Sequence, residues 1–136
     1  MKNEYIKVLF VRPGKKAGIV NTGNRAPAFR KLLKGHFTEY MPFDENHVLV
    51  ARSEGRALRE ELNRAIRDDD GNILDVIVGD FFVAGCRYDE DEYSDFDLKS
   101  ESDRKIYEML LKPEKFIMKG GRITDAERKN GNGNDD

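Results

Sequence analysis

The sequence contains one cysteine, no tryptophan, four prolines and two histidines among 136 residues. Because Cys86 has no partner, a small secreted fold held together by internal disulfides is excluded. The apolar runs, such as 76–78, are far shorter than the ~18 residues that a membrane span needs. The first residues, 1–5, show no apolar signal region. We therefore expect a soluble, cytoplasmic protein without a membrane partner.

Charged residues are abundant, at 37% of the chain, compared with roughly 25% in an average domain. Lys and Arg number 24 and Asp and Glu number 26, so the formal net charge is only −2. This balance excludes a uniformly basic nucleic-acid-binding protein, and nucleic acid is not an expected partner. The length corresponds to one domain of roughly 150 residues.

Periodicity and turn signals predict a compact α+β domain, with an antiparallel sheet of about five or six strands and two packed helices. Pro13 and Gly14 end the first strand, and Pro27 suits the first turn of a helix that Asn24 is placed to cap and Gly35 to end. The predicted strands are 5–11, 17–20, 36–43, 46–50, 73–78 and 81–84, and the predicted helices are 26–34 and 101–112. The two most apolar segments, 73–78 and 81–84, are predicted to be central strands, with Phe81 and Phe82 on opposite faces.

Two parts of the chain are harder to assign. In 53–67 the spacing of Leu58, Leu62, Ala65 and Ile66 favours a helix. After Pro113 the chain is polar and rich in Gly and Asn, so it buries little apolar surface. We expect a single domain over 1–114 and a largely disordered C-terminal extension over 115–136.

The residue types that commonly carry chemistry are sparse. His36 and His47 lie on strands predicted to face each other, but no third ligand accompanies them. Cys86 has mainly acidic neighbours, which disfavour a reactive thiolate. The turn at 68–72 does not fit the register of a calcium loop. We therefore expect no metal, no cofactor and no catalytic residues.

Charge is segregated along the chain. Residues 1–34 hold nine Lys or Arg against one Glu, a net charge of +8, whereas 67–103 hold three basic and thirteen acidic residues, a net charge of −10. Such halves can form separate binding faces, pair with each other within one domain, or join two copies head to tail in a homodimer.

Several segments resemble, in order, a family described as domain of unknown function 3846, which occurs in bacteriophages and other mobile elements of bacteria. They are 6–15, 32–35, 63–68 with 70–71, and 75–85; the most specific are 63–65 and 75–82. Relatives often carry Tyr where this chain has Leu74, and Gly and Pro where it has 59–61. The second difference bears on the helix favoured there, because the resemblance implies an extended segment or a turn over 57–66. It also implies a phage-like origin and a bacterial host cell, but no reaction, since the family has no established catalytic residues.

We expect an accessory protein without enzymatic activity that binds a host protein, such as a defence or regulatory component. The predicted contact is an acidic and aromatic segment, whose rings would anchor a basic partner surface while its carboxylates speed association. It consists of Tyr88, Asp89, Glu90, Asp91, Glu92, Tyr93 and Phe96. In the alternative interpretation these rings fold back onto the sheet. If the segment is not the contact, we expect the contact on the basic face around Arg12, Lys15 and Lys16.

An alternative function is a sponge that sequesters an anionic nucleotide signal. Its pocket would combine cationic groups with hydrogen-bond donors that converge on phosphate. The candidate residues are Arg12, Lys15, Lys16, Asn63 and Arg64. An enzyme whose site combines residues that the sequence does not connect is a third hypothesis.

Overall fold

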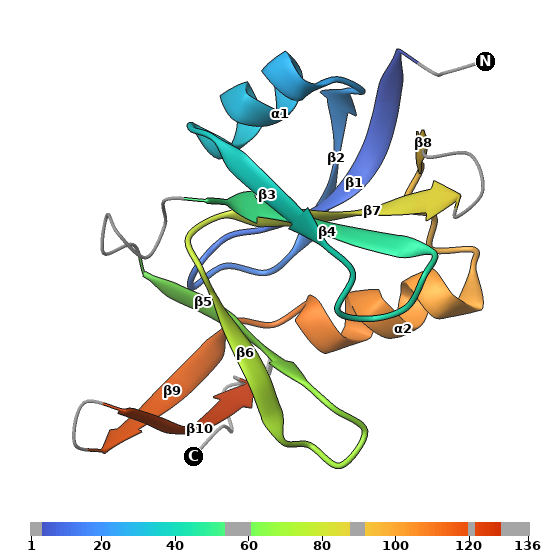
Figure 1. The fold of residues 1–136 in the computed structure, drawn as a ribbon. Coiled ribbons are helices and arrows are strands. Elements are labelled where there is room, and N and C mark those ends of the chain that lie inside the picture. Colours follow the sequence, from blue (N-terminus) through green and yellow to red (C-terminus); the bar gives the residue numbers. More distant parts are fainter. Residues whose placement is uncertain (1–3, 54–60, 88–91, 120–121, 129–136) are drawn as a thin grey trace.

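The computed structural model describes residues 4–53, 61–87, 92–119 and 122–128 (Figure 1). In chain order the elements are β1 (Tyr5–Val11), β2 (Gly18–Gly23), α1 (Ala26–Leu33), β3 (Phe37–Tyr40), β4 (His47–Arg52), β5 (Leu62–Arg67), β6 (Ile73–Val78), β7 (Phe81–Arg87), β8 (Glu92–Ser94), α2 (Glu101–Leu110), β9 (Glu114–Lys119) and β10 (Arg122–Arg128).

A six-stranded antiparallel sheet forms the centre of the molecule, with the strand order β2-β1-β7-β4-β3 and with β8 paired to the second half of β7. The residues of β7 from Phe81 to Ala84 are all fully buried. A continuous apolar run is what a strand covered on both faces requires. The prediction of a central strand at 81–84, and of a hairpin between the segments that form β3 and β4, is confirmed.

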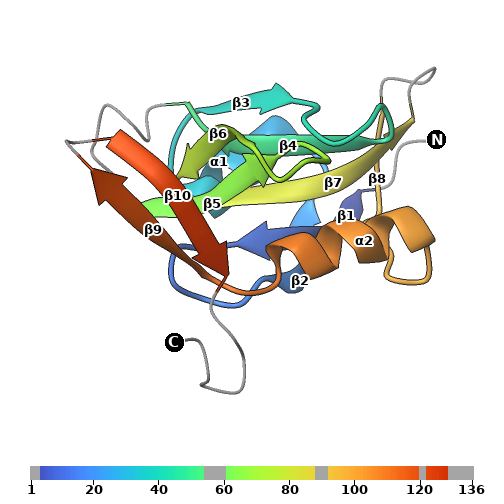
Figure 2. The same ribbon diagram turned by 90° about the horizontal axis from the view of Figure 1, so that it is seen from below.

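The sheet separates two apolar clusters, and Phe81 and Phe82 point into different ones, as predicted. On one face, α1 contributes Phe29 and Leu33 to the cluster around Phe82. On the other face, α2 and the β5–β6 hairpin cover the cluster around Phe81 (Figure 2). The domain therefore has a helix on one side of the sheet, and a helix and a hairpin on the other.

The segments before and after Asp68 form a hairpin of their own. β5 and β6 pair antiparallel in a two-stranded sheet separate from the main one. The helix favoured over 53–67 is therefore wrong for 62–67, whereas the extended segment implied by the family resemblance is confirmed there; residues 54–60 lie outside the described part of the chain. The prediction that 73–78 is a central strand is also wrong, because among the described strands β6 pairs only with β5, outside the main sheet.

The helix ends differ partly from expectation. Arg25 rather than Asn24 occupies the N-cap position of α1, without a side-chain cap, and Lys34 (φ 61°) rather than Gly35 adopts the left-handed conformation at its C-terminus. Ser100 caps α2 by accepting a hydrogen bond from the Asp103 N–H, as the sequence indicates.

The C-terminal region contains more structure than predicted. β9 and β10 pair as an antiparallel hairpin, so the expected disorder is wrong for 115–119 and 122–128. Glu114, at the start of β9, is buried, and its carboxylate accepts hydrogen bonds from the Ala65 N–H and the Arg67 side chain. This buried anchor, which sequence reasoning missed, joins the hairpin to β5.

The described elements form one α+β unit with a mainly antiparallel sheet, as predicted. None of the described helices combines the length and apolar character needed to cross a membrane.

Candidate functional site

Asn63 and Arg64, the polar pair in the most family-specific segment, are buried inside the fold. The Asn63 side-chain amide donates to the carbonyls of Val11 and Gly79. It thereby ties β5 to the end of β1 and to the turn between β6 and β7.

Arg64 joins β5 to two further segments. Its guanidinium donates to the Leu110 carbonyl (3.0 Å), the Lys15 carbonyl (2.6 Å) and the carbonyl and side chain of Asn63. The side chain is fully buried. Its donors therefore hold the end of α2 and the β1–β2 turn against β5, which is a structural role.

The five residues of the alternative nucleotide pocket do not share one surface. Arg12, Lys15 and Lys16 are exposed, whereas Asn63 and Arg64 lie beneath them in the interior. The Arg12 guanidinium lies over the Phe10 ring, 5.6 Å from its centroid. The structure brings Lys15 and Arg64 together only through the Lys15 backbone carbonyl.

The aromatic residues of the predicted contact segment face inward where the structure describes them. Phe96 is buried in the cluster beneath α2. The Tyr93 ring lies edge-on to Phe29, with centroids 5.2 Å apart, and its hydroxyl donates to the Glu39 carboxylate. Glu92 is half-buried on β8, and residues 88–91 lie outside the described part of the chain. Neither described ring projects outward as an anchor.

The two histidines lie apart from each other. His36 is exposed before β3, whereas His47 is buried between two carboxylates. The His47 Nδ1 is 2.7 Å from an oxygen of Asp44, and its Nε2 contacts Asp103, which also accepts from the Asp97 N–H. In the described residues no group of three or more metal-ligating side chains is arranged to hold an ion.

Cys86, near the end of β7, is half-buried. Burial, with a smaller contribution from the Asp44 charge, raises the pKa of the thiol above its usual value. The thiolate is the reactive form, so this environment disfavours nucleophilic chemistry at Cys86.

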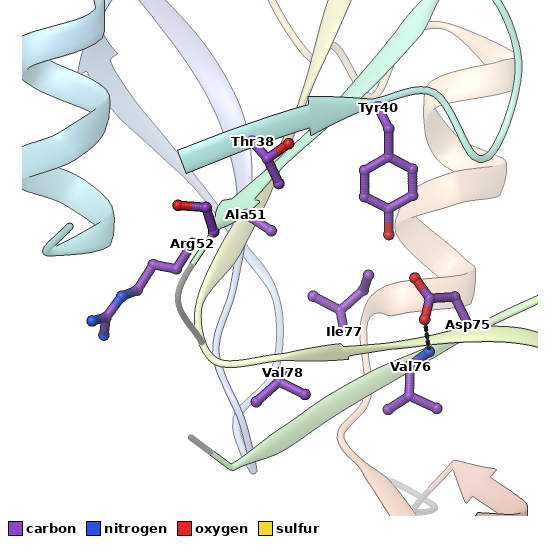
Figure 3. Close-up of a pocket in the computed structure, with 9 residues that line it drawn as sticks. Thr38, Tyr40, Ala51, Arg52, Asp75, Val76, Ile77 and Val78 are labelled. Atoms are coloured by element: carbon purple, nitrogen blue, oxygen red, sulfur yellow. Dashed lines mark hydrogen bonds between the residues drawn. The ribbon is translucent and has the colours of Figure 1, made fainter. Parts of the chain in front are cut away.

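One small pocket lies between the β3–β4 edge of the main sheet and β6 (Figure 3). Figure 3 shows the Tyr40 ring reaching from β3 toward Asp75, above Ile77. Asp75 accepts a hydrogen bond from the Val76 N–H. The pocket volume of about 180 Å³ is smaller than the ~300–1,000 Å³ of typical ligand sites. It is too small for a nucleotide.

The positive charge of the N-terminal region lies on β1, on the β1–β2 turn and on α1 with the residues that flank it, and we call these side chains the basic surface; β2 itself carries no charged residue. Its side chains are exposed and, within the described part of the chain, form no ion pair with the acidic residues of 67–103. They are Lys7, Arg12, Lys15, Lys16, Arg25, Arg30, Lys31 and Lys34. The described residues therefore do not support the interpretation in which the positive and the negative segments form ion pairs with each other within the domain.

The basic surface flanks an edge of the main sheet. β2 pairs with β1 on one side, and no described strand pairs with its other side (Figure 1). Gly23 lets α1 start close to this edge, because a Cβ at Gly23 would lie 2.9 Å from the Ala28 Cβ.

A groove lies on each side of the β2 edge. The α1 groove, of about 650 Å³, is lined by both apolar and cationic groups, including Tyr5, Arg25, Ala28, Lys31 and Leu32. The α2 groove, of about 270 Å³, is lined on the other face of the sheet by Lys7, Ile19, Leu98 and Lys99, together with 95–97.

Three of the large apolar side chains that are exposed border these grooves: Tyr5, Ile19 and Leu98, at 68%, 37% and 37% exposure. Sequence reasoning found the charge of this region but missed the edge and the grooves. The segment 18–23 carries a sequence signal for the edge strand. Its β-branched residues favour a strand, but the two flanking glycines and the weak hydrophobic pattern are not typical of a central one.

The fold and the surface thus define a small α+β protein with a sheet edge, β2, that no described strand covers and that exposed cations flank. Residues 6–110 match the model of the family described as Domain of unknown function (DUF3846), and the chain belongs to this family. No curated protein and no solved structure matches the chain.

Proposed function

We propose that the protein is an accessory protein without enzymatic activity, of phage-like origin, that binds an acidic surface of a bacterial host protein. The observation that carries this proposal is the basic surface, whose eight exposed cations form no ion pair within the described residues. Surface charge of one sign steers a partner of the opposite sign and raises the association rate.

The basic surface is a better candidate for the contact than the acidic and aromatic segment. Affinity in protein interfaces comes mainly from large side chains that become buried at the interface. Tyr93 and Phe96 are already packed within the domain, whereas Tyr5 and Ile19 beside the basic surface are exposed. We therefore place the contact with the host protein on β1, β2 and α1, and a defence or regulatory component remains the proposed kind of partner.

Affinity capture from a bacterial lysate, followed by mass spectrometry, tests this function. The bait is the full chain, compared with a variant carrying Lys15→Glu and Lys16→Glu. The control is Arg104→Glu with Lys105→Glu, because these two exposed cations on α2 give the same change in net charge elsewhere.

We expect the wild type and the α2 control to enrich the same host protein, and the Lys15 and Lys16 variant to enrich it at least tenfold less. Equal capture by all three baits would place the contact outside the basic surface. The absence of any enriched protein would contradict the proposed function itself.

A further inference from the structure

We propose that β2 is a docking strand, to which an extended, acidic segment of a partner protein adds as a further strand of the main sheet. This inference rests on the proposed function, because it specifies how the host protein would be bound. Main-chain hydrogen bonds supply affinity in this mode of recognition, and alternate side chains supply specificity.

The direction of the β2 backbone groups follows from the register. The Asn24 N–H donates to the Glu4 carbonyl (2.8 Å), so Glu4 and Asn24 form a hydrogen-bonded pair. In an antiparallel ladder such pairs alternate with pairs whose backbone groups point away. Ile6 and Thr22 are therefore a hydrogen-bonded pair, whereas at Lys7 and Asn21 the backbone groups point away from the partner strand. By the same alternation, the backbone N–H and C=O groups of Ile19 and Asn21 point to the open edge.

Two contacts confirm this alternation. The Ala17 N–H, the preceding outward group, donates to the Leu111 carbonyl (2.8 Å). Lys7, which faces Asn21, directs its own backbone groups away from β2, to the Asp95 carboxylate and the Phe96 N–H. The end of α2 therefore covers the start of the edge, and the outward N–H and C=O groups of Ile19 and Asn21 have no partner in the described residues.

The two grooves define what the added strand must carry. Successive side chains of a strand point to opposite faces of a sheet. One row would lie in the α1 groove beside Arg25 and Lys31, which favours carboxylates. The other row would lie over Ile19 and Leu98, which favour apolar side chains. Asp95 and Asp97 also line this groove, and their carboxylates accept hydrogen bonds from the Lys7 and Lys99 N–H groups. The occupant is thus an acidic segment in which carboxylates alternate with apolar residues.

Charge also argues against a second copy of this chain as the occupant. β2 itself carries no charged side chain, but pairing two β2 edges would bring the cations that flank it, such as Lys16 and Arg25, near the same cations of the other copy, and like charges repel.

A displayed library of random twelve-residue peptides, selected against the full chain, tests the inference. Enriched peptides are then synthesised with a fluorophore and titrated by anisotropy. The central comparison is Asn21→Pro against Asn21→Ala: both remove the side chain, but only proline removes the outward N–H. Lys31→Glu is compared with Arg30→Glu, a neighbouring reversal that lies outside the α1 groove.

We expect enriched peptides with alternating acidic and apolar residues. Asn21→Pro should weaken their binding at least tenfold and Lys31→Glu at least fivefold, while Asn21→Ala and Arg30→Glu stay within twofold of the wild type. If Asn21→Pro fails to fold, the same test uses peptides that are N-methylated at every second residue, in two sets that differ by one residue. We expect one of the two sets to lose binding, because its methyl groups replace the N–H groups that would donate to β2.

Three results would overturn the inference: no enriched peptide, enriched peptides without acidic residues, or equal binding to Asn21→Pro and Asn21→Ala. If the protein formed a concentration-dependent dimer that Asn21→Pro abolished, the occupant of the β2 edge would be a second copy of this chain, and the acidic segment would be ruled out. The proposed function is tested separately. If Asn21→Pro captures the host protein as well as the wild type does, only the docking strand is refuted. If peptides bind but no host protein is captured, only the proposed function is refuted.

Discussion

Replacing Arg64 with alanine should destabilise the protein severely, because the guanidinium holds three parts of the fold together. The variant leaves the buried carbonyl of Leu110 and the partly buried carbonyl of Lys15 without their donor. Hydrogen bonds to charged groups contribute about 1.5–3 kcal/mol each. Two such losses give about 3–6 kcal/mol, a large part of the ~5–15 kcal/mol that stabilises a typical domain.

This loss can be converted into a melting temperature. Unfolding entropy averages about 2.1 cal/mol/K per residue, which for this chain is about 0.3 kcal/mol/K. We therefore expect Arg64→Ala to lower the Tm by about 10–20 °C in thermal unfolding followed by circular dichroism. Arg64→Met, which keeps most of the side-chain volume but leaves the same carbonyls without a donor, should retain most of the loss.

The matched control is Arg12→Ala, since Arg12 is exposed and contacts the Phe10 ring. An exposed cation–π contact contributes about 0.5–1 kcal/mol, so the Tm should fall by no more than a few degrees. If Arg64→Ala cost no more than Arg12→Ala, the structural role of Arg64 would be refuted, and its side chain would again be a candidate for binding an anion.

Three further predictions concern the core, Cys86 and the nucleotide alternative. Phe82→Ala should lower the free energy of unfolding in urea by about 3–5 kcal/mol, since Phe82 is fully buried beneath α1; a loss below about 1 kcal/mol would be inconsistent with a central β7. Because burial and Asp44 raise the pKa of the Cys86 thiol, iodoacetamide at pH 8 should alkylate the native protein more slowly than the urea-unfolded chain, and Asp44→Asn should speed the native reaction; equal native and unfolded rates would contradict this. Calorimetry with cyclic and linear nucleotides at about 100 μM protein should give no binding heat, because Arg64 is engaged inside the fold; saturable heat that Arg12→Ala or Lys16→Ala removes would favour the sponge.

The sequence predicts well those helices and strands whose own spacing of apolar residues shows which of their faces are buried. Phe81 to Ala84 are apolar because both faces of β7 are covered, and Phe29 and Leu33 lie on one side of α1. Both assignments follow from local spacing. The resemblance adds the family, which the match over 6–110 shows.

The parts that the sequence does not predict depend on partners far along the chain. The 73–78 segment is apolar except for Asp75, yet an apolar run does not identify its neighbour, which is β5. Leu62, Ala65 and Ile66 fit helical spacing, but Ala65 donates its N–H to Glu114, 49 residues away. Sequence reasoning offered Arg64 as an anion ligand, because nothing local reveals that its partners are the carbonyls of Lys15 and Leu110.

The candidate site shows the same limit. The excess of Lys and Arg in 1–34 is visible in the sequence and predicts a basic face. That β2 lies at the sheet edge, with the backbone of Ile19 and Asn21 turned outward, follows only from strand order and register.

Hydrogen exchange at individual backbone amides, measured by NMR with and without the captured host protein, tests the central claim most directly. In the free protein the Ile19 and Asn21 amides should exchange quickly, because they point to the open edge, whereas the Val20 amide, which points toward β1, should be protected. On binding, we expect at least tenfold slower exchange at Ile19 and Asn21. Protection confined to 92–97, with Ile19 and Asn21 unchanged, would contradict the account and return the contact to the acidic segment.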